Sequence, residues 1–133
     1  MDRLAKRILV VDDEKTIRLL IADTLIEFGY DVRTAYNGAE ALDVMRRWLP
    51  DAIVLDLMMP RLDGSGFSEM LRRNLRFAAV PVLLVTATYG AREAAERIGA
   101  AAYLTKPFEL DTLLEMIDQL VEPRVPLTAI SDD

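Results

Sequence analysis

One stretch, residues 51–64, constrains the fold more than any other part of the sequence. Residues 52–55 are all apolar, which is typical of a strand buried on both faces of a parallel sheet, and the run stops at the carboxylate of Asp56. Pro60 and Gly64 then end the strand in a loop. Asp56 is therefore expected at the carboxyl end of a central strand, where open α/β sheets bind their ligands.

Composition excludes several classes of protein. A chain of 133 residues is long enough for one domain with a full core. The net charge of −6 argues against a basic nucleic-acid-binding face, so we expect no direct contact with DNA or RNA. The absence of cysteine and histidine removes disulfides, zinc sites and imidazole bases. No apolar run is long enough for a signal peptide or a membrane span, so we expect a cytoplasmic protein with no membrane contact.

Short apolar runs alternate with helical periodicity along the chain. The runs predict strands at residues 8–11, 52–55, 81–85 and 100–104, and a further short strand is predicted at residues 30–35. Five helices are predicted between and after them, with the inward positions Ile17, Leu20, Ile21, Thr24, Leu25 and Phe28; Leu42, Met45, Trp48 and Leu49; Phe67, Met70, Leu71 and Leu75; Ala91, Ala94, Ala95 and Ile98; and Leu110, Leu113, Leu114, Ile117, Leu120 and Val121. Asn37 is expected to cap the second helix, with Glu40 as its capping-box partner. Prolines after the last helix divide a folded domain, residues 1–122, from a polar tail or truncated linker, residues 123–133.

This alternation predicts an α/β fold, a flavodoxin-like doubly wound five-stranded parallel sheet with strand order 2-1-3-4-5 and five helices. The order reverses between strands one and three, which end at Asp12-Asp13 and at Asp56. These three carboxylates are therefore expected in one crevice. Because they repel one another, a hard divalent cation is the usual resolution, with Mg²⁺ favoured. The alternative is that Asp12, Asp13 and Glu14 only cap the first helix and that Asp56 is a loop residue.

Three more residues lie at or near strand ends and have two interpretations each. Lys106 follows strand five and can pair with an anion held at Asp56, although most lysines are simply solvated. Thr86 closes strand four and offers a hydroxyl to the same point, or merely fits a strand. Tyr103 lies within strand five and is either core or a side chain that moves between buried and exposed rotamers.

Together these motifs resemble the receiver domain of bacterial two-component response regulators. The resemblance rests on Asp12-Asp13-Glu14, Asp56 with Pro60 and Gly64, Thr86-Ala87, and Tyr103 with Lys106-Pro107-Phe108. Each motif is weak alone, but they occur in this order at the ends of successive strands. The resemblance covers roughly residues 7–121, so residues 1–122 are expected to form a receiver domain.

The resemblance implies a phosphorylation site. Asp56 would accept a phosphoryl group from a histidine of a sensor histidine kinase or a histidine phosphotransfer protein, because this chain contains no histidine. Mg²⁺ would be bound directly by Asp13, Asp56 and the Met58 backbone carbonyl, and by Asp12 through water. The protein would be a switch rather than an enzyme, assisting its own phosphorylation and dephosphorylation.

The resemblance also implies how the signal leaves the site. Lys106 and Thr86 would hold the phosphoryl oxygens, and Tyr103 would turn inward and repack the surface of the fourth helix, fifth strand and fifth helix. The donor protein would dock on the first helix near Ile17 and Leu20.

Two functional alternatives and two questions about partners stay open. An interaction module would never take phosphate, whereas an aspartyl-phosphate hydrolase would want an acid two residues after Asp56, where Met58 stands. Arg92 and Arg97 lie on the fourth helix, but the fifth helix has no basic residue, so the dimer used by many receivers is in doubt and any dimer would be weak or phosphorylation-dependent. The downstream partner is either another protein or an output domain outside this sequence.

Overall fold

The computed structural model describes residues 5–56, 64–86 and 89–122. Its five strands are β1 (Arg7–Val11), β2 (Asp31–Ala35), β3 (Ala52–Asp56), β4 (Val82–Thr86) and β5 (Ala102–Thr105). They form one parallel sheet in the order β2-β1-β3-β4-β5. The predicted fold class and strand order are therefore confirmed.

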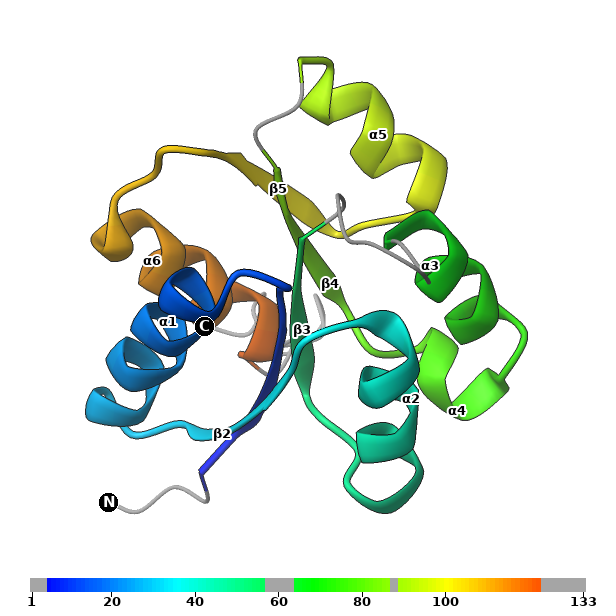
Figure 1. The fold of residues 1–133 in the computed structure, drawn as a ribbon, viewed down its shortest axis with the longest axis horizontal. Helices are drawn as coiled ribbons and strands as arrows, with labels where there is room; N and C mark the ends of the chain where they lie inside the picture. Colours follow the sequence, from blue (N-terminus) through cyan, green and yellow to red (C-terminus); the bar gives the residue numbers. More distant parts are fainter. Residues whose placement is uncertain (1–4, 57–63, 87–88, 123–133) are drawn as a thin grey trace, which may run out of the picture.

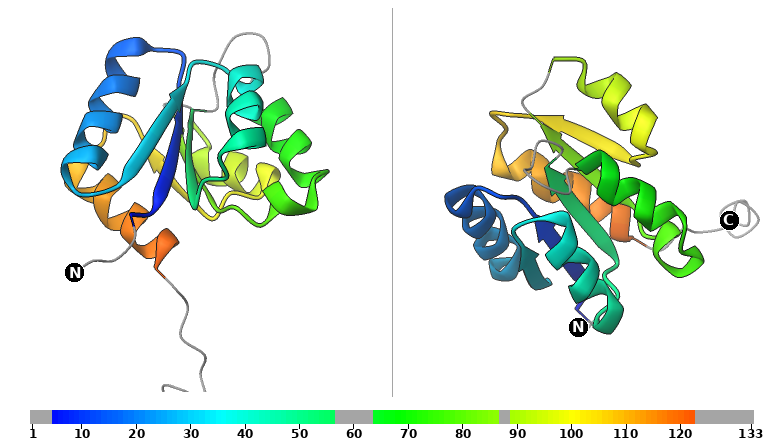
Figure 2. Two further views of the ribbon diagram at one scale, coloured as in Figure 1. Left: turned by 90° about the horizontal axis from the view of Figure 1, so that it is seen from below. Right: turned by 45° about the vertical axis from the view of Figure 1, so that its right-hand side comes forward.

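Helices cover both faces of the sheet (Figures 1 and 2). One face carries α1 (Lys15–Glu27) and α6 (Leu110–Val121), and the other carries α2 (Gly38–Arg47), α3 (Gly64–Arg72), α4 (Leu75–Ala78) and α5 (Ala91–Ile98). Successive side chains of a strand point to opposite faces, so Leu9 packs with the α2–α5 layer and Ile8 with the α1–α6 layer. Burial on both faces explains why β1, β3 and β4 read as continuous apolar runs, whereas the edge strands β2 and β5 are only partly buried.

The third predicted helix is two helices in the structure. Asn74 begins α4, because its side-chain oxygen accepts hydrogen bonds from the backbone N–H groups of Arg76 (2.9 Å) and Phe77 (3.3 Å). Asparagine competes well for this capping position, so the chain leaves the α3 axis there. The prediction that Leu75 lies inward was wrong, since it is 90% exposed, and Phe77 fills the core in its place. Met70, also expected inward, is exposed.

The inward face of α1 also differs from the prediction. The buried residues of α1 are Ile21, Ala22 and Leu25, whereas Leu20 is 48% and Phe28, which follows the helix, 63% exposed. Apolar residues lie on several sides of this helix, so its sequence does not define one buried face.

The second and fourth predicted helices are confirmed as α2 and α5. The Asn37 side chain accepts a hydrogen bond from the Glu40 backbone (2.8 Å), which confirms the predicted cap. The Glu40 side chain accepts one from the Tyr36 backbone (2.7 Å), one residue before the Asn37 N–H that a capping box would use. The α5 helix buries a face made of three alanines and Ile98. This face is small, so α5 contributes little apolar area to the core.

Candidate functional site

The ends of β1 and β3 bring two carboxylates together at the carboxyl edge of the sheet. Val11 is paired with Leu55 in the parallel register, so Asp12, which follows β1, and Asp56, the last residue of β3, are neighbours. The Asp12 backbone N–H donates to the Ala35 carbonyl (3.1 Å), which continues the β1–β2 ladder by one step. Asp12 is 2% and Asp56 6% exposed, so both carboxylates are in a largely water-excluded position.

Asp13 completes a cluster of three carboxylates. One oxygen from each of Asp12, Asp13 and Asp56 lies within 4.8 Å of the others, and Asp13 is exposed to solvent. Such a set offers hard oxygen ligands together with an open side for water or a phosphoryl group, which fits Mg²⁺. The three carboxylates that the strand order predicted to meet at this edge of the sheet therefore do lie together.

The helix-capping interpretation of the acidic loop is not supported. The N-cap of α1 is Glu14, which makes no side-chain capping hydrogen bond. The Asp12 side chain accepts a hydrogen bond from the Glu14 backbone N–H (2.9 Å), so it stabilises the loop rather than the first turn of α1. Asp12 is thereby held in place beside Asp56.

Lys106 supplies a positive charge to the carboxylates. Its ammonium lies 3.7 Å from an Asp12 oxygen and 3.6 Å from an Asp56 oxygen, and its side chain is 22% exposed. The Lys106 backbone N–H donates to the Thr86 carbonyl (3.0 Å), which fixes the start of the β5–α6 loop over the end of β4. The Lys106–Pro107 peptide bond is cis. Lys106 is therefore part of the site, not a solvated surface lysine.

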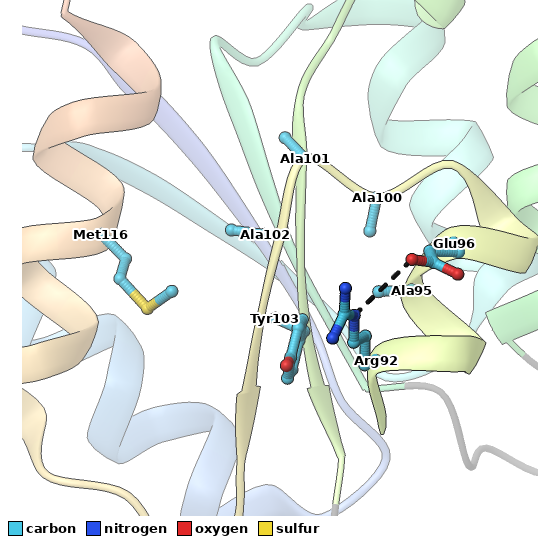
Figure 3. A pocket seen from close by; sticks show the side chains of 8 residues that line it. All are labelled: Arg92, Ala95, Glu96, Ala100, Ala101, Ala102, Tyr103 and Met116. Carbon is cyan, nitrogen blue, oxygen red and sulfur yellow. Dashed lines mark ion pairs between the residues drawn. The ribbon is translucent and has the colours of Figure 1, made fainter. Parts of the chain in front are cut away.

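Thr86 and Tyr103 lie beside and beyond this cluster. Thr86 is the last residue of β4 and is fully buried, one position past the residue that pairs with Asp56. Tyr103 is 39% exposed, so it is not a core residue in this structure. Its ring lies at the surface between Arg92 of α5 and Met116 of α6 (Figure 3).

Sequence reasoning missed one residue near the site. The Arg18 guanidinium donates a hydrogen bond to the Asp12 carbonyl oxygen (2.9 Å) and so ties the acidic loop to the first turns of α1. The only signal in the sequence was a basic residue one helical turn after Glu14. Met58, Pro60 and Ala87 lie outside the described residues.

The doubly wound sheet with a cluster of three carboxylates at its carboxyl edge defines the class of α/β protein that the motifs predicted. The chain belongs to the response regulator receiver domain family, which matches residues 8–118. Receiver domains of response regulators are the signalling switches of two-component systems and are not a classical enzyme family.

Two curated relatives and one solved structure illustrate the similarity. Response regulator MprA of Mycobacterium bovis is 41% identical over 125 residues, which cover 92% of this chain and 54% of MprA. Protein PilG of Pseudomonas aeruginosa is 36% identical over 127 residues, which cover 94% of each chain. The receiver domain of the sensor histidine kinase PA1611 of Pseudomonas aeruginosa PAO1, solved with a magnesium ion coordinated in its active site cleft, matches with a TM-score of 0.82 and 29% identity over 90% of this chain and 100% of that one. The chain spans about half the length of the first curated relatives that it matches.

No helix in the described ranges is long and apolar enough to cross a membrane.

Proposed function

We propose that residues 1–122 form a phosphorylation-operated switch in a two-component system of the cytoplasm, with residues 123–133 as a tail or linker. A sensor histidine kinase or a histidine phosphotransfer protein donates the phosphoryl group, and Asp56 accepts it in a Mg²⁺-dependent reaction. The observation that carries this proposal is the pair of buried carboxylates, Asp12 and Asp56, with Asp13 and the Lys106 ammonium beside them.

Phosphoryl transfer to Asp56 and its reversal by water need no reactants other than the donor phosphohistidine, the Asp56 carboxylate and water. An Asp56 carboxylate oxygen attacks the phosphorus of the donor phosphohistidine, the P–N bond breaks, and its electron pair stays on the imidazole nitrogen, which takes up a proton. Dephosphorylation is attack by water on the same phosphorus, which releases inorganic phosphate and restores the carboxylate. We assign Lys106, whose ammonium lies 3.6 Å from an Asp56 oxygen, to stabilise the negative charge of the phosphoryl oxygens at each step, and the buried Thr86 hydroxyl as the second group on those oxygens.

A bound Mg²⁺ would neutralise charge on the phosphoryl oxygens during the transfer. We assign Asp13 and Asp56 as its direct ligands and Asp12 as a ligand through water, in keeping with the exposed position of Asp13 and the burial of the other two. The Met58 carbonyl, proposed as a further ligand, lies outside the described residues.

The output of the switch is proposed to be the surface of α5, β5 and α6. Thr86 and Lys106 are joined by a backbone hydrogen bond, and Thr105 pairs with Thr86 at the end of β5. A change at the phosphoryl oxygens therefore has a short covalent and hydrogen-bonded route to Tyr103, two residues before Thr105. Inward rotation of the exposed Tyr103 ring would then change the surface that a partner meets.

The donor protein is proposed to dock on α1, beside the crevice. Leu20 is exposed on this helix and Ile17 is half-buried, so both are available to an apolar contact. Substituting Ile17→Glu is expected to slow phosphoryl transfer from the cognate donor while leaving labelling by a small phosphodonor unchanged.

The experiment that tests the central proposal is incubation with acetyl phosphate, with and without Mg²⁺, followed by intact-protein mass spectrometry. We expect Mg²⁺-dependent addition of one phosphoryl group to the wild type and none to Asp56→Asn, because the amide is neither nucleophile nor good metal ligand. Circular dichroism of Asp56→Asn controls for folding. A folded wild type that takes no label would favour the interaction-module alternative, and label persisting on Asp56→Asn would move the acceptor elsewhere.

A further inference from the structure

An open hollow lies between α5, β5 and α6, on the opposite side of β5 from the sheet centre (Figure 3). Its volume is about 340 Å³, and its lining is mainly small and apolar: Ala95, Ala100, Ala101, Ala102, Tyr103 and Met116. Tyr103 comes from β5 and Met116 from α6, so two different elements supply the large side chains. An apolar hollow of this kind can take a bulky apolar side chain of a partner.

The charged residues that line the hollow neutralise each other. Arg92 and Glu96 lie on the same side of α5, one helical turn apart, and their charged groups are 3.7 Å apart. The α5 helix as a whole carries two arginines and two glutamates, Arg92, Glu93, Glu96 and Arg97, so its formal charge is zero. The hollow itself therefore selects for apolar character rather than for a charge.

The neighbouring α6 helix is strongly acidic on its solvent side. Asp111, Glu115 and Asp118 of α6 and Glu122, which follows it, recur at helical spacing and are all exposed, and the helix contains no lysine or arginine. We call this set the acidic stripe. The Asp118 carboxylate also accepts a hydrogen bond from the Tyr30 hydroxyl, so Asp111, Glu115 and Glu122 are the members on which the charge argument rests. The acidic stripe continues to the C-terminal end of α6, where the helix macrodipole disfavours negative charge. Like charges at this spacing also destabilise a helix, so the acidic stripe opposes folding rather than supporting it.

This charge distribution disfavours a second copy of the chain as the occupant. A two-fold dimer through this face would bring the acidic stripes of two copies near each other, and neutral α5 offers no net positive charge to offset them. A cationic partner meets the acidic stripe without such repulsion and relieves the repulsion within α6.

We propose that the hollow and the acidic stripe together bind a cationic amphipathic segment of another protein, with a bulky apolar side chain in the hollow and lysines or arginines over α6. This assignment deepens the proposed function, because it names the kind of partner that the α5–β5–α6 surface takes. The hollow and the acidic stripe consist of side chains of α5, β5 and α6 and their flanking residues, none of which is at Asp56, so their binding chemistry can be tested apart from phosphorylation.

Two synthetic helical peptides serve as probes, one of leucine and lysine and one with every lysine replaced by glutamate. Each is titrated into ¹⁵N-labelled protein at low salt, and amide shifts give the affinity and the binding surface. We expect the lysine peptide to shift the resonances of Arg92, Tyr103 and Met116, and the glutamate peptide to leave them in place. Raising the salt from about 50 to about 500 mM should weaken the interaction, since it rests partly on exposed charges.

Three variants separate this surface from general acidity. Glu115→Lys, within the acidic stripe, is expected to weaken the lysine peptide about fivefold, since it removes an exposed attraction and adds a repulsion. The leucine side chain of Ala101→Leu occupies part of the hollow, so this variant should weaken binding of the lysine peptide by a similar factor without changing the charge of the protein. Asp43→Lys on α2, which lies on the opposite face of the sheet from α6, makes the same change in net charge as Glu115→Lys and should alter the affinity less than about twofold.

Equal binding of both peptides, or equal weakening by Asp43→Lys and Glu115→Lys, would overturn the proposal. So would shifts of Tyr103 and Met116 that depend on protein concentration alone, because the occupant would then be a second copy. Repeating the titration with Mg²⁺ and fluoroberyllate separates the two proposals. Peptide binding that is unaffected by fluoroberyllate keeps the surface but contradicts the switch, whereas a fluoroberyllate response without peptide binding keeps the switch and contradicts the partner.

Discussion

Replacing Asp13 by asparagine should stabilise the protein without metal and remove its stabilisation by Mg²⁺. Asp13 is the exposed member of a cluster whose carboxylate oxygens lie within 4.8 Å of one another. Two unit charges about 5 Å apart in water-like surroundings repel by about 0.8 kcal/mol, so removing Asp13 relieves two such pairs, about 1–2 kcal/mol. The dielectric constant of water is the appropriate one for this estimate because Asp13 faces solvent, although its two partners are buried.

Mg²⁺ should reverse the order of stability of the wild type and Asp13→Asn. A ligand at about 100 times its dissociation constant stabilises the folded state by about 2.7 kcal/mol, which exceeds the repulsion relieved by the substitution. The wild type should therefore be the less stable protein in EDTA and the more stable one in saturating Mg²⁺. In thermal unfolding the EDTA difference corresponds to roughly 5 °C.

Urea unfolding followed by the fluorescence of Trp48 measures both effects. Trp48 is the only tryptophan and is 4% exposed in the folded protein, so unfolding transfers it to water. Asp23→Asn on α1, an exposed site outside the cluster, is the matched control and should change neither the stability in EDTA nor the response to Mg²⁺. If Asp13→Asn is no more stable than the wild type in EDTA, the repulsion argument is refuted. If Mg²⁺ stabilises Asp13→Asn as much as the wild type, the assignment of Asp13 as a ligand is refuted.

The Ser68 hydroxyl is buried and has no hydrogen-bond partner among the described residues, so Ser68→Ala should raise the free energy of unfolding by about 1 kcal/mol. The control Gln119→Ala, at an exposed helical position, measures the gain in stability from helix propensity alone. An equal gain from both substitutions would contradict the role of the hydroxyl. Lys106→Met should bind Mg²⁺ more tightly by calorimetry, because the ammonium no longer offsets the carboxylates, and should slow acetyl phosphate labelling about 100-fold. The control Lys15→Met on α1 should do neither, and faster labelling of Lys106→Met would count against the proposed role. Fluoroberyllate with Mg²⁺ should change hydrogen exchange most in α5 and β5, since α5 is held by a small alanine face, and uniform changes across all helices would reject this.

The sequence predicted the site better than it predicted the helices. Apolar runs that end on Asp12, Asp56 and Thr86 define both the strands and their polar ends, because a strand buried on two faces admits no other pattern. The alternation with helices then allows few topologies, and the switch point follows from the order. The three-carboxylate cluster could therefore be predicted from the sequence alone.

Helix boundaries and exposed faces could not be predicted in the same way. Leu75 lies four residues after Leu71 and so continues the helical pattern, but the Asn74 side chain begins a new helix between them. On α1 the apolar residues surround the helix, and only the packing against the sheet selects Ile21 and Leu25 over Leu20. Both errors come from competition between local patterns of similar energy, which tertiary contacts decide.

The position of Lys106 shows how the sheet edge acts as one unit. In the strand order, β4 lies between β5 and β3, so a lysine after β5 does not neighbour Asp56 or Asp12 in the ladder. The Lys106 backbone N–H bonds to the Thr86 carbonyl, which carries the loop over the end of β4, and the long side chain then covers the remaining distance to both carboxylates. The same backbone bond fixes the end of β5, the strand that holds Tyr103 at the surface. We propose that a change at the ammonium or at Thr86 is passed through this backbone bond to β5, the strand that borders the hollow.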